Sequence, residues 1–179
     1  MEKIDVLDEN GIKTNDVENV EVVHKMGLWH RAIQVVLIDL NNKILIQQRS
    51  SSKSFFPNCW DMAITGHVAA GEISTQTAIR EIFEEIGLNF NENDLNFIFS
   101  FKDSIKAGSK TENLFFDIFC IKKDYDFEKI KIQESEVQDV KLVDIHHIRD
   151  LYNNGLLLKN KETYQLIDLL EEKFCGNKW

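Results

Sequence analysis

Residues 66–88, with the sequence GHVAAGEISTQTAIREIFEEIGL, constrain the fold of this chain more than any other segment. At about 100° per residue, the part from Ser74 onward predicts a helix with an apolar face beside a carboxylate face. Gly87 stands where such a helix would end in a left-handed residue. The segment therefore predicts a helix that packs on a core and presents acids next to it. Its apolar face consists of Ala78, Ile79, Ile82, Phe83 and Ile86.

The carboxylate face carries Glu81, Glu84 and Glu85, and Glu72 precedes the helix. Like charges three and four residues apart cost about 0.2–0.5 kcal/mol per pair, so helix stability does not explain the cluster. Arg80 can form an ion pair with Glu84 but cannot neutralise every acid. A hard divalent cation can, because Mg²⁺ and Mn²⁺ take oxygen ligands and bind substrate phosphates. The alternative interpretation is a solvated acidic surface that holds no ligand.

The segment also fits a longer pattern, Gx5Ex7REUxEExGU, in which U is an aliphatic residue. With each fixed residue at roughly one in fourteen, the seven fixed matches arise by chance in about one chain in 10⁶. This pattern is the signature of the Nudix hydrolases, which the chain resembles. The resemblance implies an α/β/α sandwich with a mixed sheet and cleavage, dependent on Mg²⁺ or Mn²⁺, of a diphosphate bond in a nucleoside diphosphate derivative. The matching residues are Gly66, Glu72, Arg80, Glu81, Ile82, Glu84, Glu85, Gly87 and Leu88.

The resemblance also implies roles for these residues. It makes Glu81 and Glu85 the principal metal ligands, and Glu84 a further ligand or the base that activates water. The Gly66 region supplies a backbone carbonyl. Glu112, at a predicted strand entrance, is the candidate ligand from outside the segment, with a merely solvated glutamate as the alternative.

The same resemblance implies supporting roles for two further residues of the segment. Glu72 supports the carboxylate cluster, and Arg80 orients it. Outside the segment, Arg31 and Arg49 lie where cations could hold substrate phosphate oxygens.

A wider stretch is similar to the branch of this family that contains isopentenyl-diphosphate isomerase and its hydrolase relatives. It comprises VLDENG, HKMGLWHRA, ILIQQRS and FPNCWDMAITGHVAAGE. In the isomerase, a cysteine before a Gly-His pair and a glutamate two residues after a metal-binding glutamate transfer protons. Here Thr65 precedes Gly66, and Leu114 stands two residues after Glu112. Because neither Thr nor Leu transfers protons near neutral pH, the sequence favours a hydrolase over an isomerase.

Two further hypotheses accompany this interpretation. His24, His30 and His67 match positions where the isomerase gathers a second metal, although a lone histidine is more often structural. A nucleotide-binding regulator without turnover is a different class of protein, and the complete signature argues against it.

Composition limits the other possibilities. The chain has 179 residues with 43% apolar and 28% charged residues, and no apolar run approaches the roughly 20 residues that span a bilayer. Its start lacks a secretory signal, so we expect a cytoplasmic location. The net charge of −9 disfavours nucleic-acid binding, which needs clustered cations. The expected partner is a small diphosphate, with no prediction of oligomeric state.

The predicted organisation is a Nudix-type domain at residues 29–179 preceded by an extension at residues 1–28. The extension should hold a hairpin with a type I′ turn at Asn10-Gly11 and a helix over residues 17–26 that ends at Gly27. The remaining predicted strands are residues 32–39, 44–49, 95–103, 112–123 and 137–145, and the remaining helices are residues 144–153 and 162–174.

Overall fold

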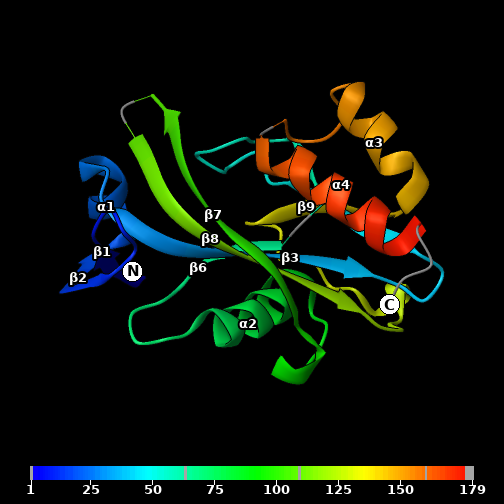
Figure 1. The fold of residues 1–179 in the computed structure, drawn as a ribbon, viewed down its shortest axis with the longest axis horizontal. Helices are drawn as coiled ribbons and strands as arrows, with labels where there is room; N and C mark the ends of the chain where they lie inside the picture. Colours follow the sequence, from blue (N-terminus) through cyan, green and yellow to red (C-terminus); the bar gives the residue numbers. More distant parts are fainter. Residues whose placement is uncertain (1, 63, 109, 160, 176–179) are drawn as a thin grey trace. The chain divides into compact units, whose positions relative to one another are not determined.

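Runs of two or more strands, separated by helices, follow one another along the chain, and two helices end it (Figure 1). The computed structural model describes residues 2–62, 64–108, 110–159 and 161–175. The described chain divides by its internal contacts into two compact units, residues 1–35, 64–84 and 89–120, and residues 36–63, 85–88 and 121–179. The architecture is the α/β fold with a mixed sheet that the sequence predicted. The predicted boundary at residue 28 stays a prediction.

The first unit begins with the predicted hairpin, formed by β1 (Lys3–Leu7) and β2 (Lys13–Asn19). The predicted type I′ turn is wrong, because Gly11 has a positive φ of 82° but Asn10 does not. The Asp8 carboxylate instead accepts hydrogen bonds from the backbone N–H groups of Asn10 and Ile12, at 2.8 and 2.9 Å. A side-chain acceptor therefore closes a longer loop than the dipeptide suggested.

Helix α1 (Val20–Met26) follows directly, and its start corrects the prediction of residue 17. Residues 17–19 belong to β2 because they pair with β1. The predicted end is confirmed, since Gly27 takes the left-handed conformation with φ of 63°. Helix α1 and strand β1 supply the buried residues of a small apolar core. This core contains Ile4, Val6 and Val23, with Val20 and Leu28 against it.

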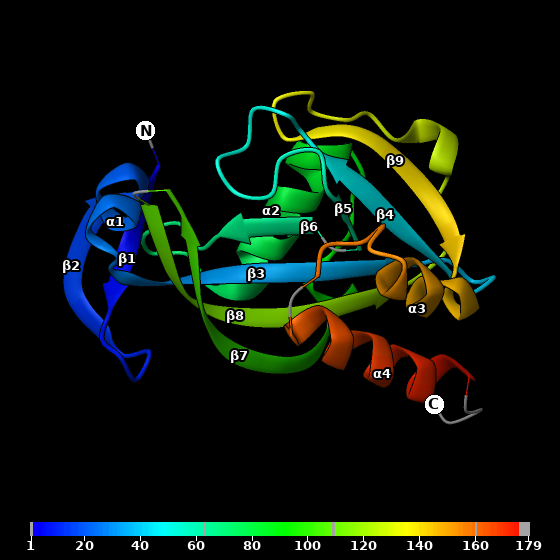
Figure 2. The same cartoon turned by 90° about the horizontal axis from the view of Figure 1, so that it is seen from above.

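Four strands carry most of the side chains discussed below. They are β3 (Trp29–Ile38), β6 (Ile64–His67), β7 (Asn96–Ala107) and β8 (Lys110–Lys122). The β7–β8 pair forms a long antiparallel hairpin, and β8 also pairs with β3 (Figure 2). In the antiparallel β3–β6 pair, Ala32 faces His67 and Ile33 faces Gly66. Since side chains alternate along a strand, His30 and Arg31 project to opposite faces of β3.

Helix α2 (Ser74–Ile86) has the predicted bounds, and Gly87 ends it with φ of 72°. Ala78, Ile82 and Ile86 are fully buried, as the helical period predicted. Phe83 was assigned to the same face but is 54% exposed. The buried stripe is therefore narrower than the predicted one, and Phe83 lies at its solvent edge.

The second unit contains β4 (Lys43–Arg49), β5 (Trp60–Asp61) and β9 (Val137–Asp144). The β9 strand pairs antiparallel with β4 along its whole length (Figure 2). Helices α3 (Ile145–Asn153) and α4 (Lys161–Cys175) lie beside each other and match the predicted helices within one residue at each end. Two single-turn 3₁₀ helices, η1 (Glu92–Asp94) and η2 (Phe127–Lys129), complete the described elements.

Candidate active site

Arg80 organises the carboxylates of the first unit. Its Nη1 donates to Glu81 Oε1 at 2.8 Å and to Glu84 Oε2 at 3.0 Å. Its Nε and Nη2 donate to Glu72, at 3.2 Å to Oε1 and 3.1 Å to Oε2. The fork geometry of one guanidinium therefore holds three carboxylates in place. The predicted Arg80–Glu84 pair is part of this wider network.

The carboxylates of this network differ electrostatically. Burial raises the pKa of Glu81 to about 7, with Arg80 opposing the shift and Glu84 adding to it. Burial also raises the pKa of Glu72, but hydrogen bonds from Arg80 and Thr77 outweigh it, and the net direction is downward. Glu84 has the most exposed side chain of the three, at 48%. Of the three carboxylates, Glu81 is therefore the one whose burial most opposes ionisation when no cation beyond Arg80 is near.

Gly66 lies directly against Glu81. A Cβ atom built at Gly66 would stand 2.2 Å from Glu81 Cδ and 2.4 Å from Oε1. Any side chain at this position would displace the Glu81 carboxylate. The glycine of the signature is thus required by close packing against a carboxylate.

Glu85 belongs to the second unit by its contacts, although it continues the same helix one turn after Glu81. Its side chain is 3% exposed, so the structure buries a carboxylate that the sequence placed beside the apolar face. The Glu85 carbonyl accepts a hydrogen bond from the Gln133 N–H at 2.8 Å.

The three histidines converge. His24 from α1, His30 from β3 and His67 from β6 each offer a ring nitrogen within 4.8 Å of the others. Glu112 from β8 joins them, with Oε1 at 3.4 Å from His24 Nε2 and 3.8 Å from His67 Nε2. Glu112, predicted as a ligand beside the signature, is therefore a member of this histidine cluster.

The protonation of the cluster suits metal ligation. Burial, reinforced by His67, lowers the pKa of His30 to about 3, and burial also lowers that of His24. Burial raises the pKa of Glu112, but the histidines, above all His67, turn the net shift downward. His30 Nδ1 lies 3.0 Å from the Leu28 carbonyl, which leaves buried Nε2 without a hydrogen-bond partner among the described residues. The neutral imidazoles of His24 and His30, next to the ionised carboxylate of Glu112, fit a transition-metal ion.

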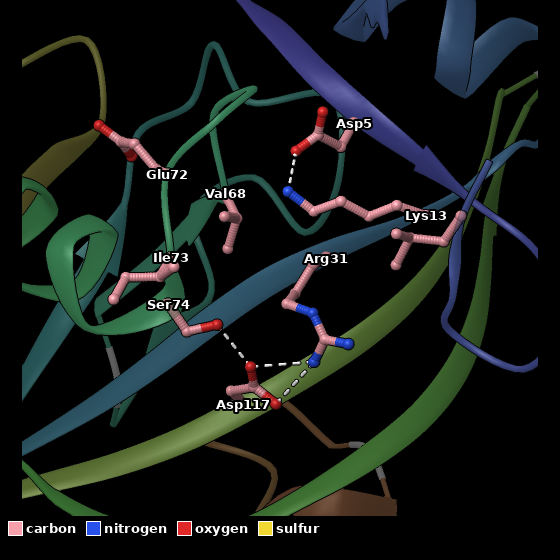
Figure 3. Close-up of a pocket in the computed structure, with 9 residues that line it drawn as sticks. Asp5, Lys13, Arg31, Val68, Glu72, Ile73, Ser74 and Asp117 are labelled. Carbon is pink, nitrogen blue, oxygen red and sulfur yellow. Dashed lines mark hydrogen bonds and ion pairs between the residues drawn. The ribbon is translucent and has the colours of Figure 1, made fainter. Parts of the chain in front are cut away.

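Arg31 and Arg49, the two residues predicted to hold substrate phosphates, lie in different surroundings. Arg31 lies in a pocket beside the start of α2, where Nη1 donates to both oxygens of Asp117 at 2.9 and 3.0 Å (Figure 3). Arg49 donates to the Phe55 carbonyl through Nε at 3.3 Å and Nη2 at 3.1 Å.

Sequence reasoning missed Asp117 and Ser74. Asp117 accepts hydrogen bonds from Ser74 Oγ at 2.5 Å and from Ser100 Oγ at 2.6 Å. The sequence did contain a signal for Asp117, since it is an acid inside the apolar run of β8. A buried charge in such a strand needs a partner.

A sequence model described as the NUDIX domain matches residues 28–166. The chain therefore belongs to the Nudix family. An uncharacterised Nudix hydrolase of Listeria innocua is 30% identical over 169 residues, which cover 94% of this chain and 95% of that protein. Nudix hydrolase 3 of Arabidopsis thaliana is 31% identical over 154 residues, covering 83% of this chain, which spans about 20% of that protein.

Two further comparisons concern half of the sequence and the fold. Isopentenyl-diphosphate Delta-isomerase of Streptomyces coelicolor is 35% identical over 86 residues, or 48% of this chain and 44% of that protein. In structure, the chain is similar to DR0079 of Deinococcus radiodurans, with a TM-score of 0.70 at 18% identity over 97% of this chain and 99% of the other. These similarities agree with the predicted fold and with an isomerase-like branch of the family.

No helix in the described part of the chain is long and apolar enough to cross a membrane.

Proposed function

We propose that this protein hydrolyses the diphosphate bond of a nucleoside diphosphate derivative or a related organic diphosphate, using Mg²⁺ or Mn²⁺. The observation that carries the proposal is the network in which Arg80 holds Glu72, Glu81 and Glu84 together. Packed carboxylates with one shared cation suit a site that works with divalent metal. The raised pKa of Glu81 supports this, because it reflects a buried carboxylate short of positive charge.

The donor set fits a hard cation. Glu81 would hold the ion with a backbone carbonyl near Gly66, and Glu85 stays a prediction as the other principal ligand. When bound, a divalent ion lowers the pKa of water and neutralises charge on phosphate oxygens.

In this proposal the side chains of the network have separate roles. Glu72 fixes the guanidinium of Arg80, which in turn limits the orientations of Glu81 and Glu84. Glu84, as the most exposed carboxylate of the network, accepts the proton of the attacking water. Arg31 and Arg49 stay predictions as cations that hold substrate phosphates, and a cytoplasmic location also stays a prediction.

The histidine cluster supports a second metal position. His24, His30, His67 and Glu112 supply imidazole and carboxylate ligands, and the orphaned Nε2 of His30 is a ligand atom with no other role among the described residues. This donor set suits Mn²⁺ or Zn²⁺ better than Mg²⁺, because imidazole is a softer ligand than an oxygen.

An isomerase is the second candidate. This protein contains the histidine cluster and Gly66-His67, and it is similar to an isopentenyl-diphosphate isomerase over 48% of its length. Thr65 and Leu114 argue against it, since neither side chain transfers a proton near pH 7. Leu114 is 1% exposed and packs in the core, as an apolar residue should.

The test is a panel of nucleoside diphosphate derivatives, dinucleotides and isopentenyl diphosphate with Mg²⁺ or Mn²⁺, in which phosphate release and double-bond isomerisation are followed separately. We expect cleavage of a panel member, which falls at least about 100-fold in Glu84→Gln. Glu134→Gln, which changes an exposed acid outside the signature, is the matched control and should keep full activity.

Isomer formation without phosphate release would replace the hydrolase with the isomerase. Full activity in Glu84→Gln would remove Glu84 from the proposed mechanism. Binding of a panel member without turnover would favour a nucleotide-binding regulator.

A further inference from the structure

The pocket beside the start of α2 differs in character from the carboxylate network and the histidine cluster. It has a volume of about 290 Å³, close to the lower end of small-molecule sites. Charged side chains of β1, β2, β3, β8 and the segment before α2 line it (Figure 3), together with the apolar side chains of Leu7, Val68 and Ile73. All of these residues belong to the first unit.

The carboxylates in the pocket already have donors. Asp117 accepts from Arg31, Ser74 and Ser100. Asp5 accepts from Lys13 Nζ at 2.5 Å and from the Gly71 N–H at 3.2 Å. The third carboxylate, Glu72, accepts from Arg80 and Thr77. The pocket therefore offers few free acceptors to a cationic ligand.

The cations of the pocket, in contrast, keep unused donors. Arg31 donates to Asp117 through Nη1 alone, and its Nε and Nη2 have no hydrogen-bond partner among the described residues. Lys13 Nζ has one such partner, Asp5, within the described chain, although an ammonium has three donors. The Nε–Nη2 edge of a guanidinium matches two oxygens of a carboxylate or phosphate.

Cations engage all three carboxylates of the pocket. Asp5 pairs with Lys13 and Asp117 pairs with Arg31, whereas Glu72 shares Arg80 with Glu81 and Glu84. The unused donors of Arg31 and Lys13 are therefore the groups that attract an anion, and no carboxylate of the lining lacks an ion-pair partner.

We infer that this pocket binds a small organic anion with one carboxylate or phosphate group and a short aliphatic body. The anionic group is held by the open edge of Arg31 and by Lys13, and the aliphatic part lies against Leu7, Val68 and Ile73. The inference goes beyond the proposed function because this binding requires neither a divalent metal nor turnover, and it gives Arg31 a ligand other than the substrate phosphate predicted from the sequence.

The test uses the ¹⁵N-labelled full chain, freed of metal on a chelating resin. It is titrated in three separate experiments with butyrate, with inorganic phosphate and with propyl phosphate. Amide shifts report both the location and the affinity of binding. We expect saturable shifts at Leu7, Val68, Ile73 and Ser74 with at least one of these anions. The three probes distinguish a carboxylate from a phosphate and show whether the aliphatic body contributes.

Two variants and one control make the site specific. Arg31→Lys keeps the charge but loses the two-donor edge, and Lys13→Gln removes an exposed charge, so each should weaken binding about tenfold or more. Lys43→Gln changes an exposed lysine of β4 outside the pocket and should bind as wild type does. A well-dispersed spectrum of each variant verifies its fold.

Absence of saturable shifts with every probe would overturn the inference, as would shifts centred on other residues. Wild-type affinity in both Arg31→Lys and Lys13→Gln would do the same. Glu84→Gln, inactive under the proposed function, should retain anion binding, so failure of one proposal is distinguishable from failure of the other.

Discussion

Individual residues in the first unit are placed by electrostatics as much as by packing. Arg80 is the clearest case, because one guanidinium holds Glu72, Glu81 and Glu84 at 3.2 Å or less. Gly66 is another, because only a missing side chain leaves room for the Glu81 carboxylate. Burial and ionisation therefore conflict at Glu81, whose pKa burial raises to about 7.

This conflict predicts a pH dependence of stability in the metal-free protein. The pKa of Glu81 rises from 4.5 to about 7 on folding, so between these values the folded state binds more protons than the unfolded state. Stability contributed by Glu81 is then present below about pH 4.5 and is lost as the pH rises toward 7. Compared with Glu81→Gln, wild type should lose free energy of unfolding across this window.

Urea denaturation with EDTA at several pH values measures the difference between the two proteins. Parallel stability curves from pH 4.5 to 8 would contradict the raised pKa. Glu134→Gln serves as the control for loss of a carboxylate at an exposed position.

Elements of the chain begin and end where local side-chain chemistry allows. Gly27 and Gly87 end α1 and α2 in the left-handed conformation, with φ of 63° and 72°. Helix α3 begins at a cap, since the Asp144 carboxylate accepts from the His146 N–H at 2.9 Å. The start of α1 was mispredicted because pairing with β1 extends β2 through residue 19.

The cap of α3 carries a stability prediction. Asp144→Ala removes the acceptor of an otherwise unpaired helix N–H and should lower the free energy of unfolding by about 1 kcal/mol. Asp144→Asn keeps a capping oxygen and should stay close to wild type. Urea denaturation of the three proteins measures this, and equal stability of Asp144→Ala and wild type would show that the cap contributes nothing.

On the scale of the whole molecule, the chain carries two candidate metal positions with different donor chemistry. The carboxylates of α2 offer oxygen ligands, whereas His24, His30, His67 and Glu112 offer mainly imidazole nitrogen. Hard Mg²⁺ suits the first set, and Mn²⁺ is compatible with both.

This difference predicts the effect of metals on unfolding. A metal that binds only the folded state at 100 times its Kd stabilises by about 2.7 kcal/mol per site. We expect Mn²⁺ to raise the melting temperature more than Mg²⁺ does, and His67→Gln to reduce the Mn²⁺ increment while leaving the Mg²⁺ increment. His147→Gln, which changes an exposed histidine of α3, is the matched control. Equal increments for both metals in wild type and His67→Gln would contradict a second site.

The sequence alone determined the local features of this protein. The period of 3.6 residues and the spacing of residues 66–88 predicted the bounds of α2, its core face apart from Phe83, and the gathering of Glu81, Glu84 and Arg80. These predictions hold because residues three and four apart on a helix are neighbours wherever the helix lies. The strand hairpins were predictable for the same reason, since each depends on a short connection.

Only the tertiary structure decided which distant residues meet. The histidine cluster draws one residue each from α1, β3, β6 and β8, and strand pairing such as Ala32 with His67 sets their approach. The Arg31–Asp117 pair joins residues 86 positions apart, and no local period relates them. Register between strands depends on many weak contacts made at once, so it is settled by the fold as a whole and not by any one segment.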